Sequence, residues 1–155
     1  MDPESIIGIV PNLSTGMFGQ SSFTLVVTNY RLIFAEVTKK LLNQERERAT
    51  ANVQNQGMMS RWKAQMSSHF NFHNRYYNIP PQSILQESPN NYELRPNQIK
   101  SVKIRAGHYD YGSGNQYSNK MVIKSSIGKN KFNFDQMNHQ EAKKILGQLL
   151  GPRVR

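Results

Sequence analysis

The most apolar stretch of the chain is residues 22–37, Ser-Phe-Thr-Leu-Val-Val-Thr-Asn-Tyr-Arg-Leu-Ile-Phe-Ala-Glu-Val. Apolar side chains recur at every second position from Phe23 to Val27, the period that is typical of a β-strand. Asn29 favours a turn, because Asn tolerates positive φ and hydrogen-bonds locally. Leu32 and Phe34 then share one face of a second strand. The stretch predicts a hairpin with two fairly apolar faces, as in central strands that a helix covers on one side.

Further strands are predicted on both sides of this hairpin. A short β-rich run at 5–10 is expected to end at Pro11, and a loop is expected to follow it as far as 22. Later in the chain, alternation predicts strands at 97–106, 120–126 and 131–135, with a polar Tyr/Gly/Ser/Asn loop at 107–119 and a turn at 128–130.

Helices are predicted in the middle of the chain and at its end. Thr38 is a candidate N-cap for a helix with a thin apolar stripe at Leu42, Ala49 and Val53. A second amphipathic helix is predicted at 58–70, and Gln82 to Glu87 are expected to form one or two further helical turns.

The closing helix begins with Asn138 as a candidate cap and ends at Gly151. Its apolar face is formed by Ala142, Ile145, Leu146, Leu149 and Leu150.

These elements predict one domain, residues 1–155, of the mainly β (α+β) class. Core strands are expected at about 4–37 and 91–135, a helical insert at 38–90 and the C-terminal helix at 137–150. The helix has the apolar face needed to close a curled antiparallel sheet of the barrel or sandwich type.

The net charge of +10 favours an anionic partner: an acidic protein, an anionic membrane or nucleic acid. The chain contains no cysteine, which excludes disulfides and thiolate chemistry. We expect no signal peptide and no transmembrane segment, and therefore a soluble protein in the cytoplasm, free or peripheral at a membrane.

Candidate binding residues fall into two groups. By alternation, a basic outer sheet face is predicted from Lys103, Arg105, Lys120, Lys124 and Lys131. Candidate apolar anchors for a membrane or a partner are Met17, Phe18, Trp62 and Met66. For both groups the alternative is a purely structural role, as a solvated face or as core packing.

Other chemistry has less support in the sequence. His69 and His73 share a helical face but lack a third metal ligand nearby, so aromatic packing is favoured over a metal site. His108 and Asp110 are close in sequence, yet no nucleophile or catalytic motif accompanies them, and we predict no enzyme activity and no cofactor. Tyr109, Tyr111 and Tyr117 near Lys120 leave nucleic-acid binding open as the alternative function.

Two motifs resemble the pleckstrin-homology-like superfamily, in particular its GRAM and its bacterial or archaeal members. Val27-Thr-Asn-Tyr-Arg-Leu-Ile-Phe34 is similar to the hairpin of those domains, and Asn97-Gln-Ile-Lys-Ser-Val-Lys-Ile-Arg105 is similar to a later strand. The resemblance covers 4–37 and 91–150, and the 61–66 stretch resembles an insert of uncharacterised prokaryotic members. It implies a module that binds phosphoinositides, peptides or other proteins, not a catalyst. The basic residues that hold phosphoinositides in this family do not carry over, because loop 11–22 has none.

Overall fold

Strands at both ends of the chain build a single sheet, with helices between them in the sequence. The computed structural model describes residues 2–16, 21–53 and 72–155, with the side chains of 48–53 excepted. In chain order the elements are β1 (Ile6–Thr15), β2 (Ser21–Thr28), β3 (Leu32–Glu36), α1 (Lys39–Val53), the 3-10 helix η1 (Phe72–Asn78), α3 (Pro81–Gln86), β4 (Tyr92–Leu94), η2 (Pro96–Gln98), β5 (Ile99–Arg105), β6 (His108–Asp110), β7 (Asn115–Tyr117), β8 (Asn119–Ser125), β9 (Gly128–Phe134), α4 (His139–Leu150) and η3 (Gly151–Arg153).

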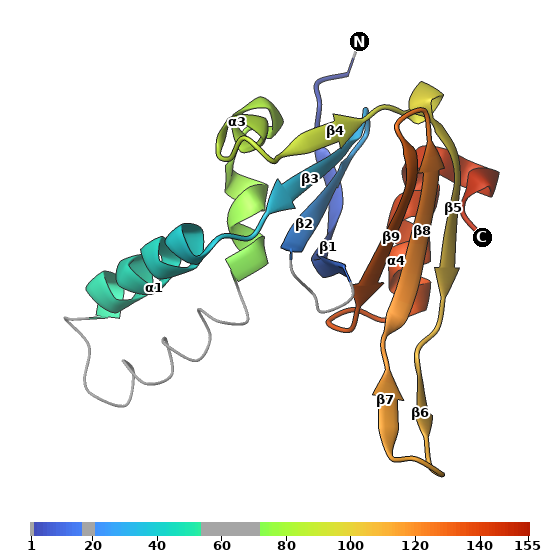
Figure 1. Cartoon of the computed structure of the whole chain (residues 1–155). Coiled ribbons are helices and arrows are strands. Elements are labelled where there is room, and N and C mark those ends of the chain that lie inside the picture. The colour runs from blue at the N-terminus through green and yellow to red at the C-terminus, as the bar shows by residue number, and fades with distance from the viewer. Residues whose placement is uncertain (1, 17–20, 54–71) are drawn as a thin grey trace.

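The main sheet is antiparallel and has the strand order β4-β3-β2-β1-β9-β8-β5. Its two halves meet where Ser14 of β1 pairs with Asn133 of β9, and they run at an angle to each other (Figure 1). The predicted mainly β class is confirmed. A curled sheet of the barrel or sandwich type was predicted. No closed barrel is found among the described residues, because β4 and β5 are the two edges and no pairing joins them.

The predicted hairpin at 22–37 is confirmed as β2 and β3, in register from Val27 opposite Leu32 to Phe23 opposite Glu36. Thr28 closes its turn: its N–H donates to the Arg31 carbonyl at 2.9 Å, and its hydroxyl accepts the Arg31 N–H at 3.0 Å. The turn was predicted from a positive φ and local hydrogen bonds at Asn29, but Asn29 has no positive φ, and its side chain instead binds Ser5 N and Pro3 O. The local hydrogen bonds of the turn come from Thr28.

The prediction that the first strand ends at Pro11 is wrong, because β1 continues to Thr15. The register of β1 against β2 shifts between Val10 and Leu13, and Asn12 takes a φ of 50° there. A bulge tolerates a proline that cannot donate to the ladder. Leu13 is fully buried after the bulge and returns the strand to the core.

Two further boundaries differ from the predictions. The turn expected at 128–130 lies at Ser126–Ile127 instead, and Gly128 with a φ of 117° already starts β9. The loop expected at 107–119 contains the two short strands β6 and β7. β4 had no clear signal in the sequence, since a strand of three residues is too short to show alternation.

The hairpin is buried on both faces. Its inner face packs with β5, β8, β9 and α4, in a core that includes Leu25, Phe34, Phe132 and Leu146. Its outer face packs with the helices of the insert. That second cluster contains Ile9, Val26, Ile33, Ala35, Leu41, Phe72, Tyr76 and Ile84. The described part of the insert therefore belongs to the folded core.

Polar contacts hold the parts of the insert together and fix the insert to the sheet. Arg75 binds Glu87 through two nitrogens at 2.8 Å each and Glu45 at 3.1 Å. His73 Nδ1 lies 2.6 Å from the Thr24 hydroxyl of β2, and its ring packs edge-on against Phe72. The predicted aromatic packing of His73 is confirmed, whereas His69 lies outside the described residues.

The closing helix α4 is confirmed at both ends. The Asn138 side chain accepts the Gln140 N–H at 2.8 Å, and Gly151 ends the helix with a φ of 59°. Gly8 allows α4 to approach β1, because a Cβ at that position would lie 2.9 Å from Ile145 Cγ2. The helix therefore seats directly on the sheet.

Arg31 is expected to be the most costly charged residue to remove. Its side chain is 9% exposed and binds Glu4 and Glu93 at 2.8 and 2.5 Å. Burial opposes its charge, but the hydrogen bonds that it donates to Glu4 and Glu93 leave its pKa raised. Arg31→Met should lower the free energy of unfolding in urea by about 3 kcal/mol, because two carboxylates lose their partner. Arg95→Met is the control. Arg95 is 64% exposed and 3.7 Å from Glu93, so the change should be under about 1 kcal/mol.

His73 should make the fold sensitive to mild acid. Burial lowers its pKa from 6.5 to about 4. Between these values the unfolded chain takes up a proton that the folded protein does not, so the free energy of unfolding should fall as pH falls, by on the order of 3 kcal/mol in all. Urea titrations at neutral pH and near pH 4 should show a smaller loss of unfolding free energy for His73→Gln than for the wild type. Equal losses would contradict this, since the carboxylates contribute equally to both proteins.

Candidate functional site

The outer surface of β5, β8 and β9 carries a cluster of basic side chains. Along each strand the alternate residues face the core, among them Val102, Met121 and Phe132. The residues between them point outward and line a groove of about 480 Å³. We call its seven basic residues the basic face: Lys103, Arg105, Lys120, Lys124, Lys129, Lys131 and Arg155. All five basic residues predicted from the sequence are brought together there.

Strand pairing arranges these side chains in rows across the sheet. Lys103 lies opposite Val122, which lies opposite Lys131. In a second row Lys124 lies directly opposite Lys129, and at the end of the sheet Arg105 lies opposite Lys120. Like charges that face each other directly across a ladder destabilise it. The arrangement therefore costs stability, and a bound anion would relieve that cost.

Two members of the basic face were missed from the sequence. Lys129 was assigned to a turn, but β9 begins one residue earlier. Arg155 lies beyond the predicted closing helix, where no strand was expected. Its backbone instead adds to the free edge of β5: the Arg155 N–H donates to Val102 O, and its carbonyl accepts from Ile104 N, each at 2.9 Å. No local sequence signal indicates this parallel pairing.

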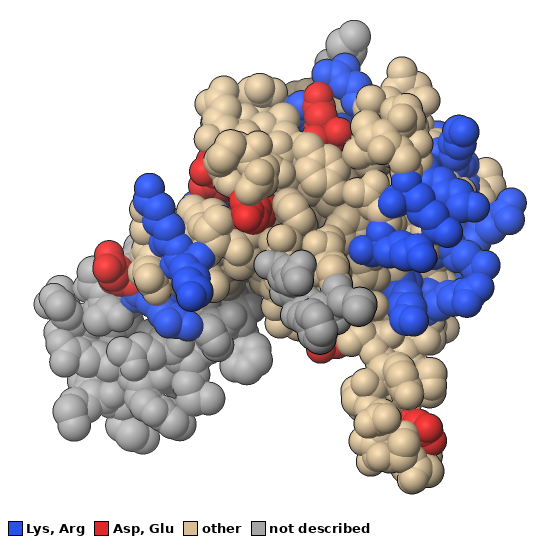
Figure 2. All heavy atoms as spheres, viewed as in Figure 1, with Lys and Arg blue, Asp and Glu red and all other residues tan. Residues whose placement is uncertain are grey.

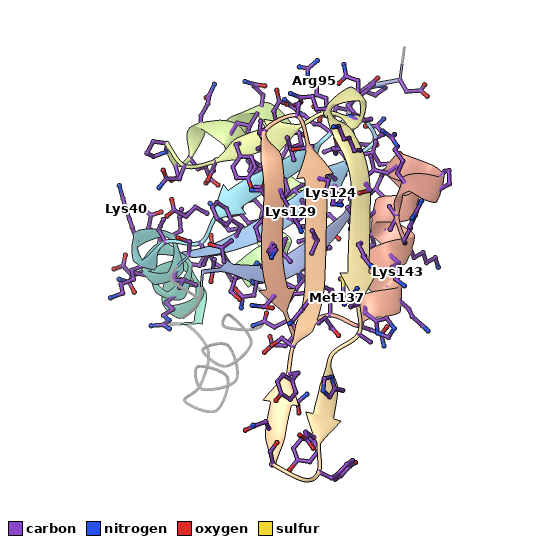
Figure 3. The ribbon with its side chains drawn as sticks, turned by 45° about the vertical axis from the view of Figure 1, so that its right-hand side comes forward. Lys40, Arg95, Lys124, Lys129, Met137 and Lys143 are labelled. Atoms are coloured by element: carbon purple, nitrogen blue, oxygen red, sulfur yellow. The ribbon has the colours of Figure 1, made fainter. Side chains whose placement is uncertain are left out.

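The basic face has no acidic residue in its lining, and no ion pair among the described residues involves its seven members. The acids that form ion pairs lie elsewhere: Glu4 and Glu93 at Arg31, and Glu45 and Glu87 at Arg75. Figure 2 shows Lys and Arg gathered over the right side of the molecule and Asp and Glu mainly over the left. In Figure 3, Lys124 and Lys129 are on neighbouring strands, while Lys143 is on α4.

A narrow hairpin extends from one end of the basic face. β5 and β8 pair as far as Arg105 and Lys120, and β6 and β7 continue in the same register with His108 opposite Tyr117 (Figure 1). We call residues 107–119 the tyrosine hairpin. Tyr109, Tyr111 and Tyr117 are 46%, 91% and 41% exposed.

Ring contacts and short hydrogen bonds order the tyrosine hairpin. His108 stacks on Tyr117 with ring centroids 4.6 Å apart, and Tyr109 meets Tyr111 edge-on at 4.8 Å. At the tip, Asp110 accepts hydrogen bonds from the Ser113 hydroxyl at 2.9 Å and the Gly112 N–H at 3.0 Å, which lower the pKa of its carboxyl. His108 and Asp110 are thus engaged in holding the hairpin.

The other sequence candidates are not part of the described site. Met17, Phe18, Trp62 and Met66 lie outside the described residues. Among the residues that are described, no group of three His, Asp or Glu side chains is placed to hold a metal ion. A pocket beside Arg31 is lined by its own ion-pair network, including Glu4 and Gln82.

Comparison of the chain with protein-family models, with curated proteins and with solved structures finds no match. None of the described helices is long and apolar enough to cross a membrane.

Gly107 should be required at the base of the tyrosine hairpin. A Cβ there would clash with the Tyr117 carbonyl and lie 2.8 Å from the Ser118 carbonyl carbon. The Gly107 N–H also donates to the Asn119 side chain at 2.6 Å. Gly107→Ala should release the strands of the hairpin, seen as faster amide exchange at Tyr109 and Gln116 with little change at Val102. As the matched control, a Cβ at Gly114 in the tip would meet only the Tyr109 hydroxyl, at an ordinary contact distance of 3.8 Å, and would have its φ of 74° against it, so Gly114→Ala should perturb the base far less.

Proposed function

We propose that this protein is a non-catalytic binding module that holds an anionic partner against its basic face. The observation that carries the proposal is the gathering of seven Lys and Arg side chains around one groove without a lining acid. Such a surface attracts and orients anions, and it discriminates against cationic partners.

We also propose that the chain is a member of the pleckstrin-homology-like superfamily. Three features support this: the β2–β3 hairpin that carries the similar motif, the later strand β5 that carries the second motif, and a C-terminal helix packed on the sheet. The phosphoinositide site of that superfamily is not part of the proposal, because residues 11–22 contain no Lys or Arg.

The lining of the groove supports binding over catalysis. Apart from the basic side chains it contains Ser101, Val102 and Val122. Acid–base catalysis needs a group that exchanges a proton near neutral pH and a partner to orient it. A row of lysines and arginines instead offers fixed positive charge to carboxylate, sulfate or phosphate groups.

An acidic protein surface and an anionic membrane are the partners expected from the charge alone. Each basic residue near an anionic membrane contributes about 1 kcal/mol of binding free energy. Nucleic acid is the second candidate function, and the exposed tyrosine rings beside the basic face favour it.

Charge reversal on the basic face tests the proposal. The triple variant Lys120→Glu, Lys124→Glu, Lys131→Glu should weaken binding to heparin, used as a soluble polyanion, by about 100-fold or more at low salt. The matched control is Lys39→Glu, Lys40→Glu, Lys144→Glu, which changes the net charge equally at exposed positions on α1 and α4. The control should retain most of the affinity.

Equal losses in the two triple variants would mean that net charge, not the basic face, determines binding. No salt-sensitive binding of the wild type to heparin, to phosphatidylserine vesicles or to an oligonucleotide would overturn the proposal altogether.

A further inference from the structure

The tyrosine hairpin continues the same two strands that carry much of the basic face. Arg105 and Lys120 are the last pair on the main sheet, and His108 and Tyr117 are the first pair of the hairpin, three residues further along each strand. Fixed cations and exposed aromatic rings therefore follow one another along a single axis. We infer that the anionic partner is single-stranded nucleic acid, whose phosphates lie on the basic face and whose bases stack on Tyr109 and Tyr111. Tyr109 lies four residues from Arg105 and so shares its face, whereas Tyr117 lies three residues from Lys120 and faces the other way.

This inference rests on the proposed function, because it names the partner of the same basic face. From Lys124 to Tyr117 the ladder spans seven residues, or roughly 23 Å at the rise of an antiparallel strand. A surface of that length suits a chain of several phosphates better than one isolated anion. OB folds, which also bind single strands on a β-surface, cover about 4 to 16 nucleotides each.

Tyr109 and Tyr111 contact each other edge-on, and both keep exposed ring surface on which a base can stack. The side chain of Tyr111 is almost fully exposed, and none of the three tyrosines belongs to either hydrophobic cluster of the described residues. Aromatic side chains held outside the core are the platforms on which unpaired bases stack. Bases inside a duplex already stack on each other, so the rings favour a single strand.

The composition of the hairpin disfavours membrane insertion. Residues 107–119 contain no Ala, Val, Leu, Ile or Met, and they include the charged residue Asp110. The hydrogen bonds that lower the pKa of Asp110 keep its carboxyl ionised near the tip. A charged tip would have to enter the interface beside anionic headgroups, which is unfavourable.

The test compares two ligands that differ only in their bases. Fluorescence anisotropy would measure binding of the full chain to a labelled oligothymidine and to an abasic oligomer of equal length, which keeps the same phosphates. The wild type should bind the oligothymidine about tenfold more tightly. Tyr109→Ala with Tyr111→Ala should remove that preference, whereas Tyr109→Phe with Tyr111→Phe should keep it, because Phe retains the ring.

Salt titrations separate the two parts of the site. Replacing Lys120, Lys124 and Lys131 by Ala should lower the slope of log affinity against log salt by about 2, since each lost phosphate contact on a single strand removes about 0.7. The Tyr109, Tyr111 double Ala variant should leave the slope unchanged. Tyr77→Ala, which removes an exposed tyrosine of the insert, serves as control and should change neither affinity nor slope.

The outcomes distinguish this inference from the proposed function. Equal affinity for the two oligomers, or no effect of the double Ala variant, overturns the nucleic-acid inference while binding to heparin through the basic face still stands. Tighter binding to phosphatidylserine vesicles or to an acidic peptide than to oligothymidine overturns it as well. Loss of all polyanion binding overturns both.

Discussion

The structure depends on burial of the β2–β3 hairpin from both sides. Leu25 and Phe34 face the core shared with β5, β8, β9 and α4, while Val26 and Ile33 face the insert. Full burial of one such side chain contributes about 1.5–3 kcal/mol. Neither layer can be removed without exposing one apolar face of this hairpin, so the insert and the C-terminal helix are both required for the fold. This explains why a segment that interrupts the sheet in sequence is packed on it in space.

The charged side chains differ between the two halves of the sheet. On the insert and at the hairpin turn, arginines form ion pairs with carboxylates: Arg75 with Glu45 and Glu87, and Arg31 with Glu4 and Glu93. These ion pairs are largely buried and serve to position segments that are distant in sequence. On β5, β8 and β9 the basic side chains have no such partners among the residues of their groove. One half of the sheet thus carries the structural ion pairs, and the other presents unneutralised charge to solvent.

The second half of the sheet is also extended beyond what packing requires. Its edge strand β5 is covered by Arg155 and Val154, and its β5–β8 ladder continues into a hairpin that no other element covers in Figure 1. Burial does not account for three exposed tyrosines on that extension, since they leave the core clusters unchanged. The proposed binding role would account for both the unneutralised cations and the exposed rings with one explanation, and neither feature stabilises the folded chain by itself.

The sequence by itself determined the elements whose signals are local. Period-two alternation located the hairpin and the outward positions Lys103, Lys120 and Lys131, and capping chemistry located α4, because each depends on residues within a few positions of one another. Only the tertiary structure decided what lies beside what. β1 continues past Pro11, and Arg155 adds to the edge of β5, through hydrogen bonds to other strands. The hairpin within 107–119 pairs residues that are close in sequence, but it forms as a continuation of the β5–β8 ladder. Pairing partners far apart in the chain leave no pattern in either segment alone, and so the basic face was predicted in part while its union with the tyrosines was not.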